Sequence, residues 1–279
     1  ADGDSLLREA FVRARARLRV EPMDAGGETR RVESAAIRLG MRDDGRSAEF
    51  VETLERGFVT IEPRGPAGVA RRVEGDRVRV EYAADNRMKA LTALGSVAAE
   101  RGPSSPGAPP LRTWSGRLEA AFEPATGEFA ELRQWENFRF EEGARRGAAA
   151  EAAFSASGDR IVLEGAAEVL DPGGRVRAHR IALDQRSQRM TAAGDVTAVY
   201  RESGGESAGG LFAEGEPVFA TALEMESDQA QNVLVYRGEA RLWQGANRVE
   251  APSIREDRAR RELRAWDAAV SILAEAPAE

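Results

Sequence analysis

The chain has 279 residues, a formal net charge of −7 at pH 7 and no cysteine. This length allows about two domains or one large all-β unit, and the acidic balance argues against a nucleic-acid partner, because domains that bind nucleic acid usually carry a basic face. Without cysteine the chain cannot form disulfides, zinc–thiolate sites or a catalytic thiolate. No run of about 18 apolar residues is present, so the sequence predicts no transmembrane helix.

The first predicted element lies near the start of the chain. Residues 6–20 could form a short amphipathic helix, but the alternation over 14–21 favours a strand. Apolar and polar residues alternate in several later segments, which is typical of half-buried strands. The clearest are 77–82, 190–200 and 234–242. Near the end, 256–266 contains good helix formers, but the spacing of Leu263 and Ala265 fits a strand better.

Turn signals separate these strands. In Asp171-Pro172-Gly173, proline presets φ for the first corner and glycine supplies the positive φ that follows. Other turns are predicted at 43–45, 85–86, 124–127 and 227–228. Longer loops are predicted at 62–71, 101–112 and 201–217. The second of these, rich in proline, glycine and serine, is the best candidate boundary, which would divide the chain into portions 1–105 and 106–279.

A short pattern recurs along the whole chain. It consists of a valine, a small residue two positions later, an apolar residue three positions after that, and a second apolar residue two positions further on. The copies are Val32-Ser34-Ile37-Leu39, Val73-Gly75-Val78-Val80, Val176-Ala178-Ile181-Leu183 and Val218-Ala220-Leu223-Met225. Val249-Ala251-Ile254 is a fifth copy, with Glu256 in the last position. Two degraded copies fill the middle, at Thr113-Ser115-Leu118-Ala120 and within 148–156. Repetition at this period predicts a stack of similar β-hairpins with a long apolar interior.

A second half-pattern, glycine followed two residues later by valine or alanine, accompanies the first. Its copies are Gly57-Val59, Gly95-Val97, Gly165-Ala167, Gly194-Val196 and Gly238-Ala240. Glycine inside a strand pattern indicates a bulge or a close backbone approach.

No catalytic pattern is present. The sequence lacks a dinucleotide-binding glycine motif, a phosphate-binding loop and a nucleophile elbow. His179 is the only histidine, so a multi-histidine metal site is impossible, and its place in a repeat copy predicts an outward strand residue. Adjacent carboxylates at 43–44 and 141–142 are best explained as solvated turn or strand-end residues. The sequence therefore nominates no catalytic residue, no metal ligand and no cofactor.

Three segments carry a resemblance to a known family. Tyr236–Ala251, Gly165–Asp184 and Met190–Val196 each resemble the OstA-like repeat of lipopolysaccharide-transport proteins, a family that includes LptA, LptC and the amino-terminal domain of LptD. The resemblance is good over about 158–273 and recognisable over about 30–100. It departs from the pattern over 101–157 and again at Asp267, where the family pattern has glycine.

The resemblance implies an all-β fold, a twisted open β-jellyroll built from repeated antiparallel hairpins, either extended or in tandem. It implies a periplasmic protein of the bridge between the inner and outer membranes, with or without a membrane anchor outside these residues. Its partners would be lipopolysaccharide, held by its lipid A acyl chains in an apolar groove, and other jellyroll proteins of the bridge joined by edge-strand addition. Head-to-tail self-association would use the same edges.

The groove candidates are the apolar residues of the repeated inner face. They are Val73, Val78, Val80, Ile161, Leu163, Val176, Ile181, Leu183, Val196, Leu223, Leu242, Val249 and Ile254. Because groove and core residues share one face of a strand, the pattern does not separate them. Two alternatives to a non-enzymatic lipid carrier stay open: a structural β-solenoid with a dry core, and a carbohydrate-active β-helix enzyme whose carboxylates converge from different strands.

Overall fold

The structure is a computed structural model that describes residues 6–21, 28–63, 69–103, 105–123, 129–155, 159–201, 212 and 216–271. Over these residues the chain forms strands, turns and bends, without a helix. The strands are β1 (Glu9–Val20), β2 (Thr29–Met41), β3 (Ala48–Thr53), β4 (Gly57–Glu62), β5 (Arg71–Gly75), β6 (Arg77–Tyr82), β7 (Met88–Arg101), β8 (Leu111–Phe122), β9 (Phe129–Glu142), β10 (Arg145–Phe154), β11 (Arg160–Asp171), β12 (Gly174–Asp184), β13 (Arg189–Arg201), β14 (Pro217–Asp228), β15 (Val233–Gln244), β16 (Asn247–Asp257), β17 (Glu262–Trp266) and β18 (Ala269–Ser271).

The chain divides into two compact units. Unit 1 comprises residues 1–143 and 151–158, and unit 2 comprises 144–150 and 159–279. The proline-rich segment at which the sequence suggested a boundary connects β7 to β8, and these two strands pair with each other from Ala90–Ala121 to Arg101–Leu111. The compact units therefore divide further along the chain than residue 105, and the assignment of jellyroll portions stays a prediction.

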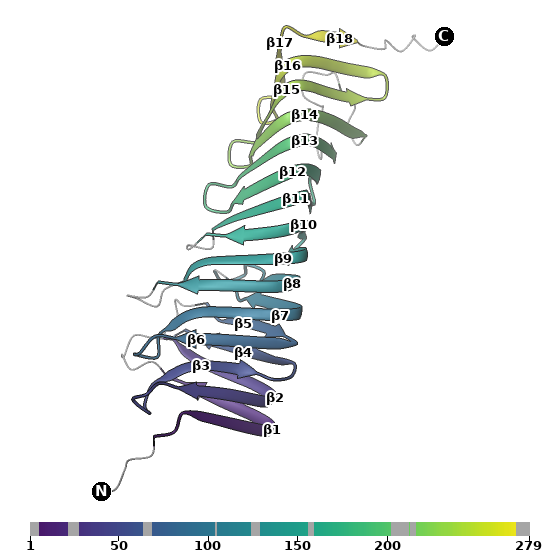
Figure 1. The fold of residues 1–279 in the computed structure, drawn as a ribbon. Coiled ribbons are helices and arrows are strands. Elements are labelled where there is room, and N and C mark those ends of the chain that lie inside the picture. The colour runs from purple at the N-terminus through teal and green to yellow at the C-terminus, as the bar shows by residue number, and fades with distance from the viewer. Residues whose placement is uncertain are drawn as a thin grey trace, which may run out of the picture. The chain divides into compact units, whose positions relative to one another are not determined.

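Unit 1 has two walls that share an interior (Figure 1). β2 pairs with β3 through its second half and with β4 through its first half. β7 pairs with β6 through its first half and with β5 through its second half. The first wall consists of β3, β6 and the strand segments 88–94, 117–122 and 129–135. The second wall consists of β4, β5 and the segments 97–101, 111–115 and 139–142. Val59 and Val73 of the second wall belong to the same buried cluster as Val80 and Leu91 of the first wall.

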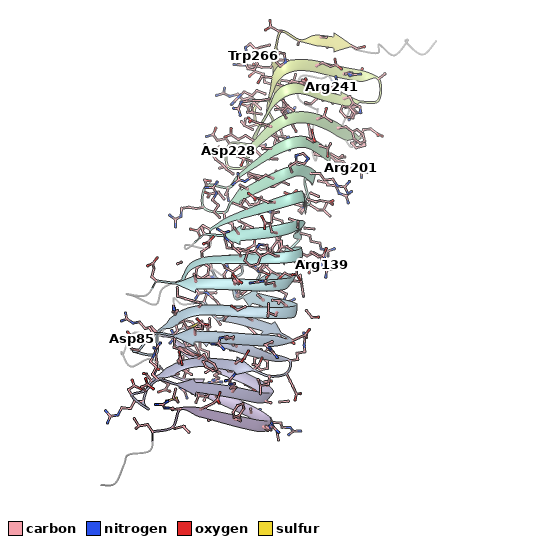
Figure 2. The ribbon with its side chains drawn as sticks, in the orientation of Figure 1. Asp85, Arg139, Arg201, Asp228, Arg241 and Trp266 are labelled. Atoms are coloured by element: carbon pink, nitrogen blue, oxygen red, sulfur yellow. The ribbon has the colours of Figure 1, made fainter. Side chains whose placement is uncertain are left out.

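Unit 2 repeats this design as a simple meander. Strands β11 to β16 pair in succession, all antiparallel, and β17 and β18 both pair with β16. Every long pair has a register shift near its middle, and in β12, β14 and β16 the alternation of buried residues shifts by one residue there. Most charged side chains project outward, as those of Arg201 and Arg241 do in Figure 2, whereas Asp228, Glu256 and Asp257 are buried. The predicted fold class, an all-β jellyroll of repeated antiparallel hairpins, is confirmed.

The bend between the two walls explains four of the five copies of the glycine half-pattern, whereas Gly57 opens β4 and does not have positive φ. At each bend of alternate strands, two consecutive residues adopt positive φ opposite a single residue of the neighbouring strand, which is a β-bulge. The pairs are Ala14-Arg15, Gly95-Ser96, Glu136-Asn137, Gly165-Ala166, Gly194-Asp195 and Gly238-Glu239. Glycine at the first position avoids the steric penalty that a Cβ meets in this region. Asp267, the position that departs from the family pattern, also has positive φ, at 51°.

The predicted strands and loops mostly match the structure. The strand expected over 14–21 is the second half of β1, and the segment 256–266 ends one strand and forms β17 rather than a helix. The three predicted loops coincide with the β4–β5, β7–β8 and β13–β14 connections. The turn predicted at 124–127 lies outside the described residues, as does most of the loop over 201–217.

Candidate functional site

The predicted groove residues, Leu223 excepted, are buried on the inner faces of the walls. Exposure ranges from 0% at Val80, Leu163, Ile181, Leu242 and Ile254 to 8% at Val176. Antiparallel pairing stacks them in rows: Val176 lies opposite Ala198, Ala198 opposite Ala220, Ala220 opposite Leu242 and Leu242 opposite Val249. The repeat therefore produces a continuous apolar inner face within unit 2.

Leu223 is a correction, because its side chain is 52% exposed and lies on the outer surface. The register gives the reason. Ala192 lies between Ile181 on β12 and Met225 on β14, so Met225 occupies the position that the pattern gave to Leu223. The repeat in this strand starts at Ala220 rather than Val218, and Leu223 instead stands opposite the bulge at Gly194-Asp195.

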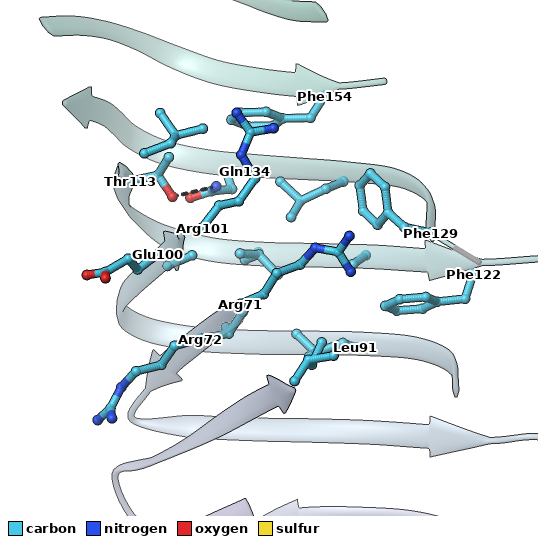
Figure 3. A pocket seen from close by; sticks show the side chains of 17 residues that line it. Arg71, Arg72, Leu91, Glu100, Arg101, Thr113, Phe122, Phe129, Gln134 and Phe154 are labelled. Carbon is cyan, nitrogen blue, oxygen red and sulfur yellow. Dashed lines mark hydrogen bonds between the residues drawn. The ribbon is translucent and has the colours of Figure 1, made fainter. Parts of the chain in front are cut away.

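An apolar cavity of about 130 Å³ lies between the two walls of unit 1 (Figure 3). Its apolar lining comes from Ile61, Val73, Leu91, Ala99, Leu111, Leu118, Ala120, Phe122, Phe129, Leu132 and Phe154. Phe122 and Phe129 meet edge to face with their ring centroids 6.1 Å apart. A cavity of about 150 Å³ is known to take a benzene-sized ligand, so this cavity has room for a segment of an acyl chain rather than a whole chain.

The buried polar side chains of Gln134 and Thr113 interrupt the apolar lining. Gln134, which is 1% exposed, donates a hydrogen bond from Nε2 to Thr113 Oγ1 at 2.8 Å. Its Oε1 accepts a hydrogen bond from Ser115 Oγ at 3.0 Å. These hydrogen bonds offset the cost of burying the amide, which lies on the opposite wall from the two hydroxyls.

Arginines stand at the rim of this cavity, where the strands of the second wall end. Arg71 opens β5, and Arg101 closes β7. Arg71 Nη1 lies 3.4 Å from Glu28 Oε1, and its guanidinium carbon lies 6.0 Å from the centre of the Phe129 ring. Figure 3 shows Arg71 and Arg101 reaching over the cavity, while Arg72 and Glu100 point away from it. The site therefore combines an apolar interior with a cationic rim.

Sequence reasoning found little of this lining. Of the predicted groove residues, Val73 lines the unit 1 cavity and Val176 lines a second cavity in unit 2. The aromatic residues Phe122, Phe129 and Phe154 were missed. Phe122 follows the degraded copy at 113–120, and Phe154 lies within the one at 148–156, so these weak copies were the available signal.

The cavity in unit 2 is different in character. Its volume is about 160 Å³, and its lining includes Asp171, Arg175, Asp228 and Arg258 together with apolar residues. Beside it lies Glu256, which is 1% exposed. Tyr200 Oη donates a hydrogen bond to Glu256 Oε2 at 2.7 Å, and Arg258 Nε lies 3.1 Å from Glu256 Oε1. A polar cluster therefore crosses the interior of unit 2.

The described residues give little support for a metal site or for a catalytic acid–base pair that includes His179. Among the described residues, no cluster of three or more histidine, aspartate or glutamate side chains is suited to a metal ion. His179 is exposed, as predicted, with its Nε2 3.3 Å from Asp195 Oδ2 at the adjoining bulge. Within the described part of the chain, no helix is long and apolar enough to cross a membrane.

Comparisons with known proteins give a likeness among solved structures. No protein-family model and no curated protein matches this chain. Among solved structures, the chain is similar to LptH from Pseudomonas aeruginosa, which is described as the LptA-homologous periplasmic component of the lipopolysaccharide transport device. The TM-score is 0.40 and the sequence identity 16%, over 47% of this chain and 95% of that chain. The chain is thus similar to LptH over less than half of its own length.

Proposed function

We propose that this protein is a non-enzymatic lipid carrier that holds an acyl-chain segment between the two walls of unit 1. The observation that carries the proposal is the apolar cavity there, lined from both walls and rimmed by arginines. Each methylene removed from water contributes about 0.8 kcal/mol to the free energy of binding, so burial of even a short acyl-chain segment favours binding.

The lipid we propose is lipopolysaccharide, and the location is the periplasm, where the protein would form part of the bridge between the two membranes. The resemblance of the repeats to the OstA-like pattern supports this choice. An amphiphile with several acyl chains cannot cross an aqueous compartment unless those chains stay covered. A stack of hairpins with an apolar inner face and charged outer positions provides such cover.

We further propose that neighbouring jellyroll proteins, or further copies of this chain, join by strand addition. Among the described residues, β1 pairs with β2 alone, so its other edge offers unpaired backbone groups. Two large apolar residues, Phe11 and Val12, are exposed on β1. At the other end of the chain, β18 pairs with β16 and is exposed at each of its residues. The two compact units would be successive jellyroll portions of one such bridge component.

A structural protein with a dry core is the second candidate, and one observation favours it for unit 2. The Tyr200–Glu256 hydrogen bond spans the interior there, and Ile181 and Leu242 are fully buried. A photo-crosslinker at Ile181 that never captures lipopolysaccharide during transport would support this reading for unit 2 and leave the cavity of unit 1 as the lipid site.

The test of the proposed function is the lipid that the purified protein retains. Lipid extraction and mass spectrometry should recover lipopolysaccharide from the native chain. Ala99→Trp fills the cavity from the inner side of β7 and should abolish this retention. Ala98→Trp is the matched control, because neighbouring residues of a strand point to opposite faces, and it should retain the lipid. Equal retention by the two variants, or none by the native chain, would contradict the proposal.

A further inference from the structure

Arg71 and Arg101 form a cross-strand pair of like charges. In the register of β5 and β7, they are directly opposite each other. Cross-strand neighbours on one face lie about 4.5–5.5 Å apart at Cβ, and like charges in such a pair are destabilising. Glu28 beside Arg71 and Glu142 beside Arg101 offset part of this repulsion.

The same row of the second wall carries a third arginine on its inner side. Arg30 lies opposite Ile61, and Ile61 lies opposite Arg71. Ile61 and Arg30 are each 3% exposed, which confirms that this row faces the interior. The row continues from Arg101 to Leu111, and Leu111 lies opposite Glu142. Along this row Arg71 and Arg101 are therefore adjacent, with the apolar side chains of Ile61 and Leu111 on either side of them.

Each rim arginine has a carboxylate within 4.0 Å of its guanidinium group. Arg71 Nη1 is 3.4 Å from Glu28 Oε1, and Arg101 Nη2 is 3.9 Å from Glu142 Oε1. The side chains of these four residues remain between 20% and 38% exposed, so solvent and solutes reach them. Guanidinium groups favour planar, bidentate contacts with oxyanions at about 2.7–2.9 Å, so two neighbouring arginines suit an anion with several oxygens.

We propose that Arg71 and Arg101 bind the phosphate group of a phosphorylated amphiphile whose acyl chain enters the unit 1 cavity. This rests on the proposed function, since it uses the same cavity, and adds a recognised head group. A phosphate monoester carries a charge of about −1.5 to −2 near pH 7, which matches two guanidinium groups, whereas a carboxylate carries one charge and a hydroxyl none.

The experiment compares three short amphiphiles with the same chain. Octyl phosphate, octanoate and octanol are titrated by calorimetry into the full-length protein, each below the concentration at which it forms micelles. We expect octyl phosphate to bind most tightly, octanoate more weakly and octanol most weakly. The advantage of octyl phosphate over octanol should shrink as salt is added, because partly exposed charges are screened.

Variants assign the effect to the two arginines. Arg71→Gln and Arg101→Gln should each weaken octyl phosphate binding by about 10-fold to 100-fold and leave octanol binding unchanged. Arg112→Gln is the matched control, because it removes the same charge from an exposed arginine that pairs with Glu100. Arg71→Lys keeps the positive charge but lacks the bidentate fork of a guanidinium group, so it should weaken octyl phosphate binding less than Arg71→Gln does. Such an intermediate loss would show that the effect of Arg71→Gln does not come from misfolding.

The outcomes separate this inference from the proposed function. If octyl phosphate and octanol bind the native protein equally, or if the glutamine variants leave their ratio unchanged, the head-group site is refuted while the lipid cavity stands. Octanoate binding as tightly as octyl phosphate would refute the preference for phosphate. If none of the three amphiphiles binds, both the head-group site and the lipid cavity are refuted.

Discussion

Tyr200 on β13 and Glu256 on β16 are joined by a 2.7 Å hydrogen bond through the interior of unit 2, although 56 residues separate them in the chain. Tyr200 belongs to the half of β13 beyond its bulge, and Glu256 belongs to the half of β16 that pairs with β17. The two residues therefore stand on opposite walls. Arg258 completes the cluster with its guanidinium carbon 4.2 Å from the centre of the Tyr200 ring.

The first prediction concerns the strength of this connection. Tyr200→Phe removes the hydroxyl that donates to a buried carboxylate, and we expect it to destabilise the protein by about 1.5–3 kcal/mol. Tyr82→Phe is the matched control, because the buried hydroxyl of Tyr82 has no hydrogen-bond partner among the described residues. That control should be neutral or stabilising in denaturant titrations. Equal losses in the two variants would show that the Tyr200–Glu256 bond contributes nothing.

The second prediction concerns alkaline pH. Burial raises the pKa of all three tyrosines, Tyr82, Tyr200 and Tyr236, above the usual value near 10, and the nearby Glu256 raises the pKa of Tyr200 and Tyr236 further. The unfolded chain releases these protons near pH 10 while the folded chain keeps them. Their contribution to stability is therefore fully present below about pH 10 and is lost as pH rises toward the higher folded pKa values.

Ultraviolet titration of tyrosinate checks this expectation. The folded protein should show no tyrosine ionisation near pH 10, and ionisation should coincide with unfolding as followed by circular dichroism. A tyrosine that titrates near pH 10 in the folded protein would mean that at least one of the three rings is open to solvent.

The third prediction concerns the bulges at the bends. Gly165 has φ +78°, and a Cβ placed there would lie 2.7 Å from Ala150 Cβ. Gly165→Ala should destabilise the protein by at least about 1–2 kcal/mol, because the left-handed region disfavours a Cβ and the space is occupied. Ala166→Gly, at the adjacent position with φ +50°, should be neutral or stabilising. Thermal denaturation compares them, and a harmless Gly165→Ala would remove the steric account of the glycine half-pattern.

The fourth prediction tests the corrected register of β14. Leu223→Ala should change the free energy of unfolding by less than about 0.5 kcal/mol because this side chain is mostly exposed. Ile181→Ala, in the position that the sequence pattern made equivalent, should cost about 2–5 kcal/mol because Ile181 is fully buried. If the two substitutions cost the same, Leu223 belongs to the interior and the register is wrong.

The sequence predicted the architecture well because alternation and glycine placement are local signals. Gly95, Gly165, Gly194 and Gly238 each lie where a bulge needs positive φ, so the recurring half-pattern reports the bend between the walls directly. The departure at Asp267 follows the same rule, since aspartate tolerates the left-handed region better than most residues.

The candidate site was harder to predict because it depends on which strands meet. Phe154 reaches the cavity of unit 1 from a region where the repeat is weak, and Arg71 and Arg101 become neighbours only through the pairing of β5 with β7. The error at Leu223 has a related cause. The alignment that starts at Val218 fits the pattern better, because the one that starts at Ala220 puts Ser227 in the last apolar position. Only the pairing with β13 shows that the second alignment is the correct one.

The central claim, that an acyl chain lies between the walls of unit 1, is tested most directly by site-specific photo-crosslinking during transport in cells. Leu132 lines the cavity, and its neighbour Arg133 is exposed on the other face of β9. We predict that a crosslinker at Leu132 captures lipopolysaccharide and that one at Arg133 does not. Capture at Arg133 alone, or at neither position, would contradict the account.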